Sequence, residues 1–320
     1  GGPGGLDAGA RRHLEGDLRR ARTRLVSAGR RRRRLLVAAA LAVLVVGAGL
    51  GLNTLRAWLG VAVVQHTPEA LARQLRPHYV VTRPGGDGPF PTTLLFSGCD
   101  GPRDNLTRLA EDLARLGWAS VVVDSHAPRH LDHAEQWRLV CAGQLLTGTE
   151  RAADVAVALA DVRAMDFVAP DRLALLGASH GGWAVLDLLA LQSTGELPPI
   201  LERWPSSVER RGLAGVRAAL LLYPYCGELS RVADTGWSAP IPVLFLLVAG
   251  DTIADEADCR ALARRVRAAG QPVEVHVFDG VTHGFDQADK AALSALAFDP
   301  EAAARARALV TGFLRRHASP

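Results

Sequence analysis

The sequence predicts an α/β fold with a mostly parallel, doubly wound sheet, preceded by one transmembrane helix. Two observations predict the sheet. Short apolar runs recur from about residue 78 onward, and segments with helical spacing separate them. Parallel strands have this continuous apolar character because helices cover both faces of their sheet. A third observation predicts the transmembrane helix, since residues 35–55 contain no charged side chain.

The N-terminal part divides at that uncharged stretch. Residues 1–34 carry eleven arginines against three acidic residues and are rich in glycine, so we expect a basic, largely disordered tail. Residues 35–56 are expected to form a transmembrane anchor, because at about 1.5 Å per residue the uncharged run matches the hydrocarbon core of a bilayer. A cleaved signal peptide is the alternative, although no clear Ala-x-Ala site follows.

Charge also predicts the orientation and the partners. Arg30–Arg34 abut the apolar run, which places the tail in the cytoplasm and the rest outside a bacterial inner membrane. Residues 35–320 hold 26 basic and 30 acidic side chains, so nothing indicates a nucleic-acid partner. No cluster has metal-ligand spacing and no phosphate-binding loop is present. We therefore expect a membrane and a small molecule as partners, with no cofactor, no metal and no obligate protein partner.

The elements follow in order along the chain. Residues 57–77 are expected to form a stalk, in which Thr67 and Pro68 begin a short helix. The main domain is expected to span residues 78–320. Its predicted strands are 79–82, 92–96, 118–123, 172–176, 218–222, 241–248 and 273–278. Its predicted helices are 106–116, 150–165, 255–269 and 301–316. Residues 192–212, rich in proline and charge, interrupt this alternation and are expected to be a surface insertion.

The junction after the predicted strand 172–176 carries the clearest motif. Gly177-Ala-Ser179-His-Gly181 links that strand to an apolar helical pattern, as a nucleophile elbow does. Glycines flank the serine in such a turn because a Cβ there would collide with the neighbouring chain. An ordinary glycine-rich turn is the alternative.

A nucleophilic serine needs a base, and the base needs a group that fixes its tautomer. Asp251 follows the predicted strand 241–248, and His283 follows the strand 273–278. Both therefore lie at the sheet edge where Ser179 is expected. The sequence predicts Ser179 as nucleophile, His283 as general base and acid, and Asp251 as the orienting carboxylate. Asp255 is the reserve acid, but it is equally suited to cap the next helix.

The predicted chemistry also needs two N–H donors for an oxyanion. We expect them to be the backbone N–H groups of His180, after the nucleophile, and of Cys99, in the glycine-rich loop after strand 92–96.

Four further residues are possible contacts for the substrate. Arg129 and His126 follow strand 118–123, where a guanidinium can hold a carboxylate. Trp183 and Tyr225 are candidates for the pocket wall. A structural ion pair for the arginine and core positions for the aromatic residues are the alternatives.

The stretch 78–318 resembles the dienelactone hydrolase family of α/β-hydrolases. The similarity is carried by Ser97–Gly101, Val123–Ser125, Pro128-Arg129, Gly177–Gly182, Leu222–Tyr225, the Asp251 loop and Val281–Asp286. The resemblance implies hydrolysis of an ester or lactone without a metal or organic cofactor. The chain departs from the family in having serine at position 179, where the founding members have cysteine, and Ser97-Gly98 in place of His-Gly.

The sequence thus predicts a membrane-anchored serine hydrolase acting on a carboxylic ester, thioester or lactone. A serine peptidase of the prolyl-oligopeptidase type and a catalytically silent hydrolase fold used as a binding or scaffold module are the alternatives. The four cysteines allow three disulfide pairings, with buried free thiols as a further possibility. If they pair, Cys226 with Cys259 and Cys99 with Cys141 is the favoured arrangement.

Overall fold

The computed structural model describes residues 8–290, 294 and 296–318. The chain forms two compact units, Gly1–Leu55 and Arg56–Pro320. The strands are β1 (Tyr79–Thr82), β2 (Phe90–Phe96), β3 (Ala119–Val123), β4 (Val168–Ala178), β5 (Val216–Leu222), β6 (Val243–Val248) and β7 (Val273–Phe278). The α-helices are α1 (Ala8–Trp58), α2 (Pro68–Leu75), α3 (Asp104–Arg115), α4 (His133–Glu135), α5 (Gly148–Val162), α6 (His180–Thr194), α7 (Ser206–Arg211), α8 (Arg231–Thr235), α9 (Glu256–Ala268) and α10 (Pro300–His317). Shorter helical turns are η1 (Arg76–His78), η2 (Ala127–Arg129) and η3 (Gln136–Val140).

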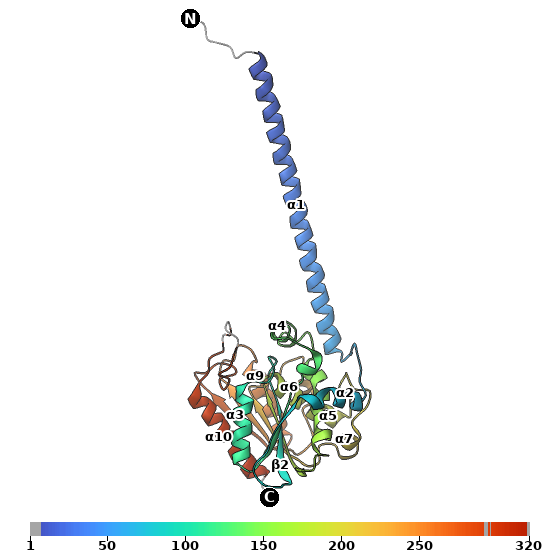
Figure 1. Ribbon diagram of the computed structural model, residues 1–320, viewed down its shortest axis with the longest axis vertical. Coiled ribbons are helices and arrows are strands. Elements are labelled where there is room, and N and C mark those ends of the chain that lie inside the picture. The colour runs from blue at the N-terminus through green and yellow to red at the C-terminus, as the bar shows by residue number, and fades with distance from the viewer. Residues whose placement is uncertain (1–7, 291–293, 295, 319–320) are drawn as a thin grey trace. The chain divides into compact units, whose positions relative to one another are not determined.

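Helix α1 differs from the sequence prediction for the basic tail. Residues 8–34, expected to be disordered, are helical and continue directly into the apolar segment (Figure 1). Alanine, leucine, arginine and glutamate all favour a helix, and their local propensity extends it beyond the apolar run. Within α1, Arg31–Trp58 is long and apolar enough to cross a membrane, and an 18-residue window within it has a mean hydropathy of 2.6. A signal sequence meets the same criterion.

The second unit is built on a seven-stranded sheet, which confirms the predicted fold class. The strand order is β1-β3-β2-β4-β5-β6-β7, and all neighbours are parallel except the edge pair β1 and β3. Strand β4 therefore lies in the middle of the sheet. The carboxyl ends of β2, β4, β5, β6 and β7 share one edge, where ligands of open α/β sheets bind.

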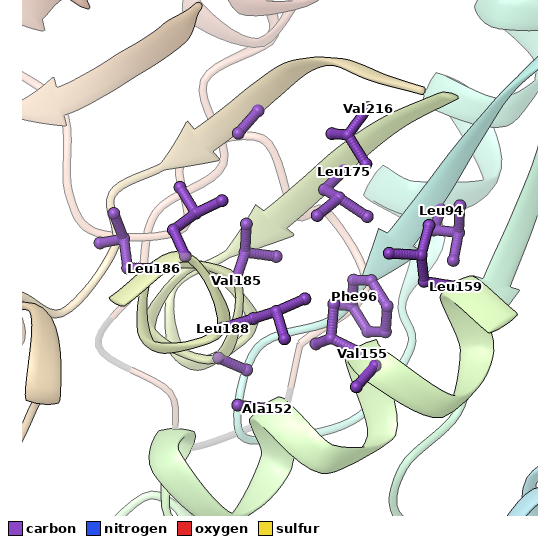
Figure 2. Close-up of a cluster of buried hydrophobic side chains, with 14 of the residues drawn as sticks. Leu94, Phe96, Ala152, Val155, Leu159, Leu175, Val185, Leu186, Leu188 and Val216 are labelled. Atoms are coloured by element: carbon purple, nitrogen blue, oxygen red, sulfur yellow. The ribbon is translucent and has the colours of Figure 1, made fainter. Parts of the chain in front are cut away.

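Helices cover both faces of this sheet. Alternate residues of one strand face opposite layers, so Leu175 lies in the core beneath α5 and α6, and Leu176 in the core beneath α3 and α10. The two helical layers lie on opposite sides of the strands in Figure 1. Figure 2 shows how the first layer packs, with Val155 of α5 and Leu188 of α6 against Phe96 of β2. Burial on both faces explains the unbroken apolar runs of the central strands.

Two segments predicted to lie outside the core are in fact packed into it. Helix α2, in the expected stalk, buries Leu71 and Leu75 completely. Thr67 caps it as predicted, accepting a hydrogen bond from the Ala70 N–H at 3.2 Å. The expected insertion 192–212 contains the end of α6 and all of α7, and it buries Val208 in the same core. The apolar residues of both segments pack against the core, so the expected stalk and surface insertion are parts of the main domain.

Asp187 of α6 connects three helices inside this layer. Its carboxylate accepts hydrogen bonds from the Thr149 hydroxyl at 2.6 Å, the Trp183 indole N–H at 2.9 Å and the Val232 N–H at 3.1 Å. The side chain is fully buried. Burial raises the pKa of the Asp187 carboxyl to about 6, although these donors oppose the rise.

We expect this carboxyl to make the domain less stable as the pH rises. An aspartate in an unfolded chain has a pKa of about 3.9, so between about pH 4 and pH 6 the folded state holds a proton that the unfolded state lacks. The free energy of unfolding should fall by up to about 3 kcal/mol as this proton is lost. Urea unfolding of the wild type and of Asp187→Asn at several pH values tests this. The wild type should lose stability relative to the variant between pH 4 and 7, and parallel pH profiles would contradict the prediction.

Candidate active site

Ser179 occupies the turn between β4 and α6. Its φ of 51° and ψ of −115° lie outside the regions that most non-glycine residues adopt. The turn is held by the Ser179 N–H, which donates to the Leu222 carbonyl at 2.8 Å, and by the Trp183 N–H, which donates to the Ser179 carbonyl at 3.1 Å. This conformation is that of a strained strand-to-helix elbow with its hydroxyl at the carboxyl edge of the sheet.

The glycines on either side of Ser179 are required by close backbone contacts. A Cβ on Gly177 would lie 2.3 Å from the Gly181 carbonyl oxygen. A Cβ on Gly181 would lie 2.3 Å from the carbonyl oxygen of Phe96, the last residue of β2. Both distances are far below van der Waals contact. The steric reason given for these glycines in the sequence therefore matches the packing of the turn.

A continuous hydrogen-bonded chain links Ser179 to the loops after β6 and β7. The His283 Nε2 lies 2.8 Å from the Ser179 Oγ, and the His283 Nδ1 lies 2.7 Å from an Asp251 carboxylate oxygen. The imidazole and the carboxylate are both buried, with 7% and 1% of their side chains exposed. With a proton on Nδ1 donated to Asp251, Nε2 is free to accept the serine proton.

The two acidic candidates have different roles in the structure. The second oxygen of Asp251 accepts hydrogen bonds from the Ile253 and Ala254 N–H groups at 2.9 and 3.1 Å. Burial raises the pKa of the Asp251 carboxyl, but its bonds to His283 and to these N–H groups outweigh burial and hold the pKa below its ordinary value. Asp255 instead caps α9 by accepting from the Ala257 N–H at 2.9 Å. The geometry thus assigns the histidine contact to Asp251.

The loop after β2 lies beside the serine. A Cβ on Gly98 would lie 3.8 Å from the Ser179 Cβ, and Gly98 and Cys99 face the same cavity as Ser179. His180 is the first residue of α6, so its N–H has no acceptor within the helix. The two segments from which we predicted oxyanion donors therefore both adjoin Ser179.

A cavity of about 240 Å³ opens over Ser179 and His283. Trp137, Ile253 and Leu296 supply apolar surface, and the disulfide between Cys99 and Cys141 forms part of the wall. The other lining residues are Gly98, Asp100, Gly101, Asn105, Ala178, Tyr223, Gly284, Gln287 and Ser294. No lysine or arginine is among these described lining residues.

Comparison with known proteins supports the same architecture. The sequence of residues 206–318 matches the dienelactone hydrolase family. Esterase 2 of Thermogutta terrifontis with butyrate bound has a TM-score of 0.55 and 17% identity, covering 74% of this chain and 88% of that chain. The same esterase phosphorylated by paraoxon gives 0.56 and 18%, covering 76% and 90%. A candidate dienelactone hydrolase of Klebsiella pneumoniae subsp. pneumoniae MGH 78578 gives 0.53 and 14%, covering 75% and 99%.

The protein has the α/β-hydrolase fold. The match to the dienelactone hydrolase family confirms the resemblance seen in the sequence, over a shorter range than the predicted 78–318. No curated protein is similar enough in sequence to match the chain.

Two disulfides link loops of this α/β-hydrolase fold. Cys226 pairs with Cys259, and Cys99 pairs with Cys141, which is the arrangement that the sequence favoured. The first is buried between the loop after β5 and helix α9. The second ties the loop after β2 to the end of η3, the turn that carries Trp137. Free thiols are excluded for all four cysteines.

A buried network that the sequence analysis missed supports the histidine loop. The Tyr223 ring lies edge-on to the His283 imidazole, with 4.7 Å between ring centroids. The Tyr223 hydroxyl donates to the Asp286 carboxylate at 2.5 Å, and the Asn105 amide donates to its other oxygen at 3.3 Å. Tyr223 and Asp286 both lie in segments that carried the family resemblance. Neither residue stands in a sequence pattern that predicts this hydrogen bond.

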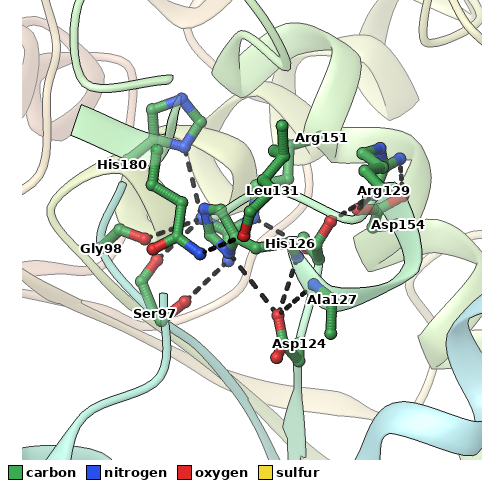
Figure 3. Close-up of polar contacts among 12 residues, drawn as sticks. Ser97, Gly98, Asp124, His126, Ala127, Arg129, Leu131, Arg151, Asp154 and His180 are labelled. Carbon is green, nitrogen blue, oxygen red and sulfur yellow. Dashed lines mark hydrogen bonds and ion pairs between the residues drawn. The ribbon is translucent and has the colours of Figure 1, made fainter. Parts of the chain in front are cut away.

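The predicted polar contacts to substrate are not supported by the structure. Arg129 does not line the cavity but forms a bidentate ion pair with Asp154, both bonds at 2.9 Å (Figure 3). His126 is 1% exposed, lies 3.6 Å from Asp124 and is not among the residues that line the cavity. Burial lowers the pKa of its imidazole, which favours the neutral ring. The structural ion pair was therefore the correct interpretation of Arg129.

The two aromatic candidates also lie outside the cavity lining. Trp183 is 4% exposed and donates its indole N–H to Asp187. Tyr225 packs against Trp183, with 4.8 Å between the ring centroids. Trp183 packs against the start of α5, where a Cβ on Gly148 would lie 2.1 Å from the indole ring. The aromatic surface of the cavity comes instead from Tyr223, after β5, and from Trp137, on a turn for which the sequence predicted no element.

Proposed function

We propose that the protein is a serine hydrolase that cleaves a carboxylic ester, thioester or lactone through an acyl-enzyme. The observation that carries this proposal is the hydrogen-bonded chain from the Ser179 hydroxyl through His283 to Asp251, at the floor of a largely apolar cavity. This arrangement makes an alcohol nucleophilic at neutral pH. The apolar lining suits the acyl or alcohol part of a neutral ester.

In the first half-reaction the Ser179 Oγ attacks the acyl carbon as its proton passes to His283 Nε2. The Asp251 carboxylate holds the imidazole in place and stabilises the cation that forms. The C–O or C–S bond then breaks, and the leaving alcohol or thiol takes the proton from His283. In the second half-reaction water gives a proton to His283, attacks the acyl carbon and releases the acid, and Ser179 regains its proton.

We assign the developing oxyanion to the N–H groups of Cys99 and His180. Gly98 and Cys99 face the cavity beside Ser179, and His180 begins the helix whose N-terminal end points at the same place. Both the free N–H groups of a first helical turn and the helix dipole favour negative charge. The scheme uses side chains and backbone only and draws on no metal or organic cofactor.

The comparisons support the choice of substrate class. Thermogutta terrifontis esterase 2 shares the fold and is described with butyrate bound and as phosphorylated by paraoxon. The C-terminal part of this chain matches the dienelactone hydrolase family. We infer hydrolysis of carboxylic esters from this likeness together with the Ser179 geometry.

We further propose that the apolar part of α1 anchors the enzyme in a bacterial inner membrane. Arg31–Trp58 meets the length and hydropathy of a membrane span, and arginines 30–34 precede its uncharged run. The positive-inside rule then puts the N-terminal segment in the cytoplasm and the hydrolase domain in the periplasm. Both disulfides suit that oxidising compartment.

A fluorophosphonate probe tests the activity. We expect it to label the wild type at Ser179 and hydrolysis of p-nitrophenyl butyrate to accompany labelling. Ser179→Ala should abolish both, whereas Ser193→Ala, a serine of the same helix bonded to the Leu189 carbonyl, should leave both intact. A folded wild type without labelling would favour the silent scaffold, and labelling with peptide substrates preferred over esters would favour the peptidase.

The same probe in a membrane-impermeant form tests the location. In a Gram-negative host with a permeabilised outer membrane, it should label Ser179 without disruption of the inner membrane. The labelled protein should remain in the membrane pellet after a carbonate wash. Labelling that requires a broken inner membrane would contradict the orientation, and labelled protein in the wash would indicate a cleaved signal peptide.

A further inference from the structure

Arg151 is a buried charge that the proposed mechanism leaves unused. It lies in the first turns of α5 and is 0% exposed, the largest of the fully buried side chains. Burying a guanidinium is costly unless hydrogen bonds or a counter-charge compensate. The hydrogen-bond partners of Arg151 therefore indicate its role.

The guanidinium contacts both segments that we assign to the oxyanion hole (Figure 3). On the β2 loop, Nη1 donates to the Ser97 carbonyl at 2.8 Å and lies 3.5 Å from the Gly98 carbonyl, while Nη2 donates to the Ser97 hydroxyl at 3.2 Å. On the elbow side, Nη1 lies 3.3 Å from the His180 Nδ1. The Arg151 Nε donates to the Ser125 hydroxyl at 2.9 Å, which fixes the plane of the guanidinium.

These contacts set the direction of the N–H groups across the loop. In a trans peptide the N–H points opposite to the preceding carbonyl. The Ser97 and Gly98 carbonyls face Arg151, so the N–H groups of Gly98 and Cys99 point away from it. Gly98 and Cys99 also line the cavity beside Ser179. A guanidinium holding these carbonyls therefore keeps the loop N–H groups aimed at the reacting carbonyl.

The charge of Arg151 has carboxylates near it but none in direct contact within the described part of the chain. Asp154, one turn along α5, forms its ion pair with Arg129, and Asp154 and Asp124 attract the Arg151 guanidinium only from beyond ion-pair distance. Burial lowers the pKa of the guanidinium to about 10, which leaves it protonated at neutral pH. A cation beneath both donor segments stabilises negative charge that develops above them.

We propose that Arg151 is a positioning residue for the oxyanion hole. It holds the Ser97–Cys99 loop and His180 in fixed positions relative to each other and adds positive electrostatic potential at the oxyanion. The inference rests on the proposed hydrolase function. It implies that Arg151 stabilises the transition state more than the bound ester.

Arg151→Met in the full-length chain in detergent tests the proposal. We expect kcat for p-nitrophenyl butyrate to fall by about 100-fold, the effect of losing one oxyanion donor, with KM changed by less than roughly threefold. Affinity for a trifluoromethyl ketone, which binds serine hydrolases as a tetrahedral oxyanion, should fall by a similar factor. A purely structural role would not produce this parallel loss.

Arg163→Met is the matched control. Arg163 lies at the other end of α5 and also donates to two backbone carbonyls, those of Gly212 at 3.1 Å and Ala214 at 2.6 Å. It contacts neither the β2 loop nor the elbow. This variant should lose stability while kcat and inhibitor affinity stay at the wild-type level.

Three results would overturn the proposal. One is a folded Arg151→Met with wild-type kcat, and another is a loss of kcat without loss of inhibitor affinity. If Arg151→Met does not fold, Arg151→Lys is tested in its place, because lysine keeps the positive charge but loses the planar guanidinium. A kcat of Arg151→Lys within roughly threefold of wild type would be the third result. A wild type that neither hydrolyses esters nor reacts with fluorophosphonate would instead refute the hydrolase function itself.

Discussion

Replacing His283 with alanine is expected to lower kcat for ester hydrolysis by about 10⁶-fold, because Ser179 then has no base. The imidazole is the only group bonded to the Ser179 hydroxyl in the described structure, at 2.8 Å. KM should change little, since the cavity walls are untouched. Steady-state kinetics with p-nitrophenyl butyrate measure both parameters.

The non-additivity of the triad gives a sharper form of this test. Ser179→Ala combined with His283→Ala should be no slower than either single variant, because the residues act as a unit. His276→Ala is the control, since this histidine of β7 pairs with Glu274 and lies outside the cavity lining. It should keep wild-type kcat. If His283→Ala retained more than a tenth of the activity, the assigned base would be wrong.

Asp251→Asn is expected to lower kcat by about 10⁴-fold while the protein stays folded. An amide at this position can donate a hydrogen bond to Nδ1, which would place the imidazole proton on Nε2, facing the Ser179 hydroxyl. The hydroxyl would then have no acceptor for its proton. Because the pKa of Asp251 is held below its ordinary value, the wild-type carboxylate stays ionised at every pH where ester hydrolysis is assayed.

Asp255→Asn provides the comparison for Asp251→Asn. Asp255 lies in the same loop, and asparagine is as good a helix cap as aspartate. Its kcat and its unfolding midpoint should both remain close to wild type. Equal losses in the two variants would show that the loop, rather than the carboxylate bonded to His283, is what matters.

Much of the site was predictable because its residues follow strands. In a parallel sheet all carboxyl ends meet at one edge, so the positions of Ser179, Asp251 and His283 directly after apolar runs predict that they converge. The glycines of the elbow are recognisable in the sequence because each has a steric cause. Only glycine fits at position 177, beside Gly181, and at position 181, beside Phe96. The choice between Asp251 and Asp255 needed coordinates, because four residues of loop decide which carboxylate reaches the imidazole.

The rest of the site depends on contacts between segments far apart in the chain. Arg151 contacts Ser97 and His180 from a helix whose sequence predicts only apolar packing against the sheet. No residue next to it in the sequence indicates that its side chain is buried at the site. Arg129 follows a strand just as the residues of the proposed triad do, but its side chain forms an ion pair with Asp154 instead of lining the cavity. The cavity wall at Trp137 comes from a short turn that the Cys99–Cys141 bond links to the loop after β2.

The sequence by itself determined the layered α/β architecture, the apolar segment near the N-terminus and the place of Ser179 in a strand-to-helix turn, because each of these leaves a local pattern of hydrophobicity or a steric requirement for glycine. Only the tertiary structure decided which buried charges serve the site, which helices belong to the core and what surrounds the serine. Those outcomes depend on which side chains meet across the fold, and the partner of a charge cannot be deduced from its neighbours in the chain.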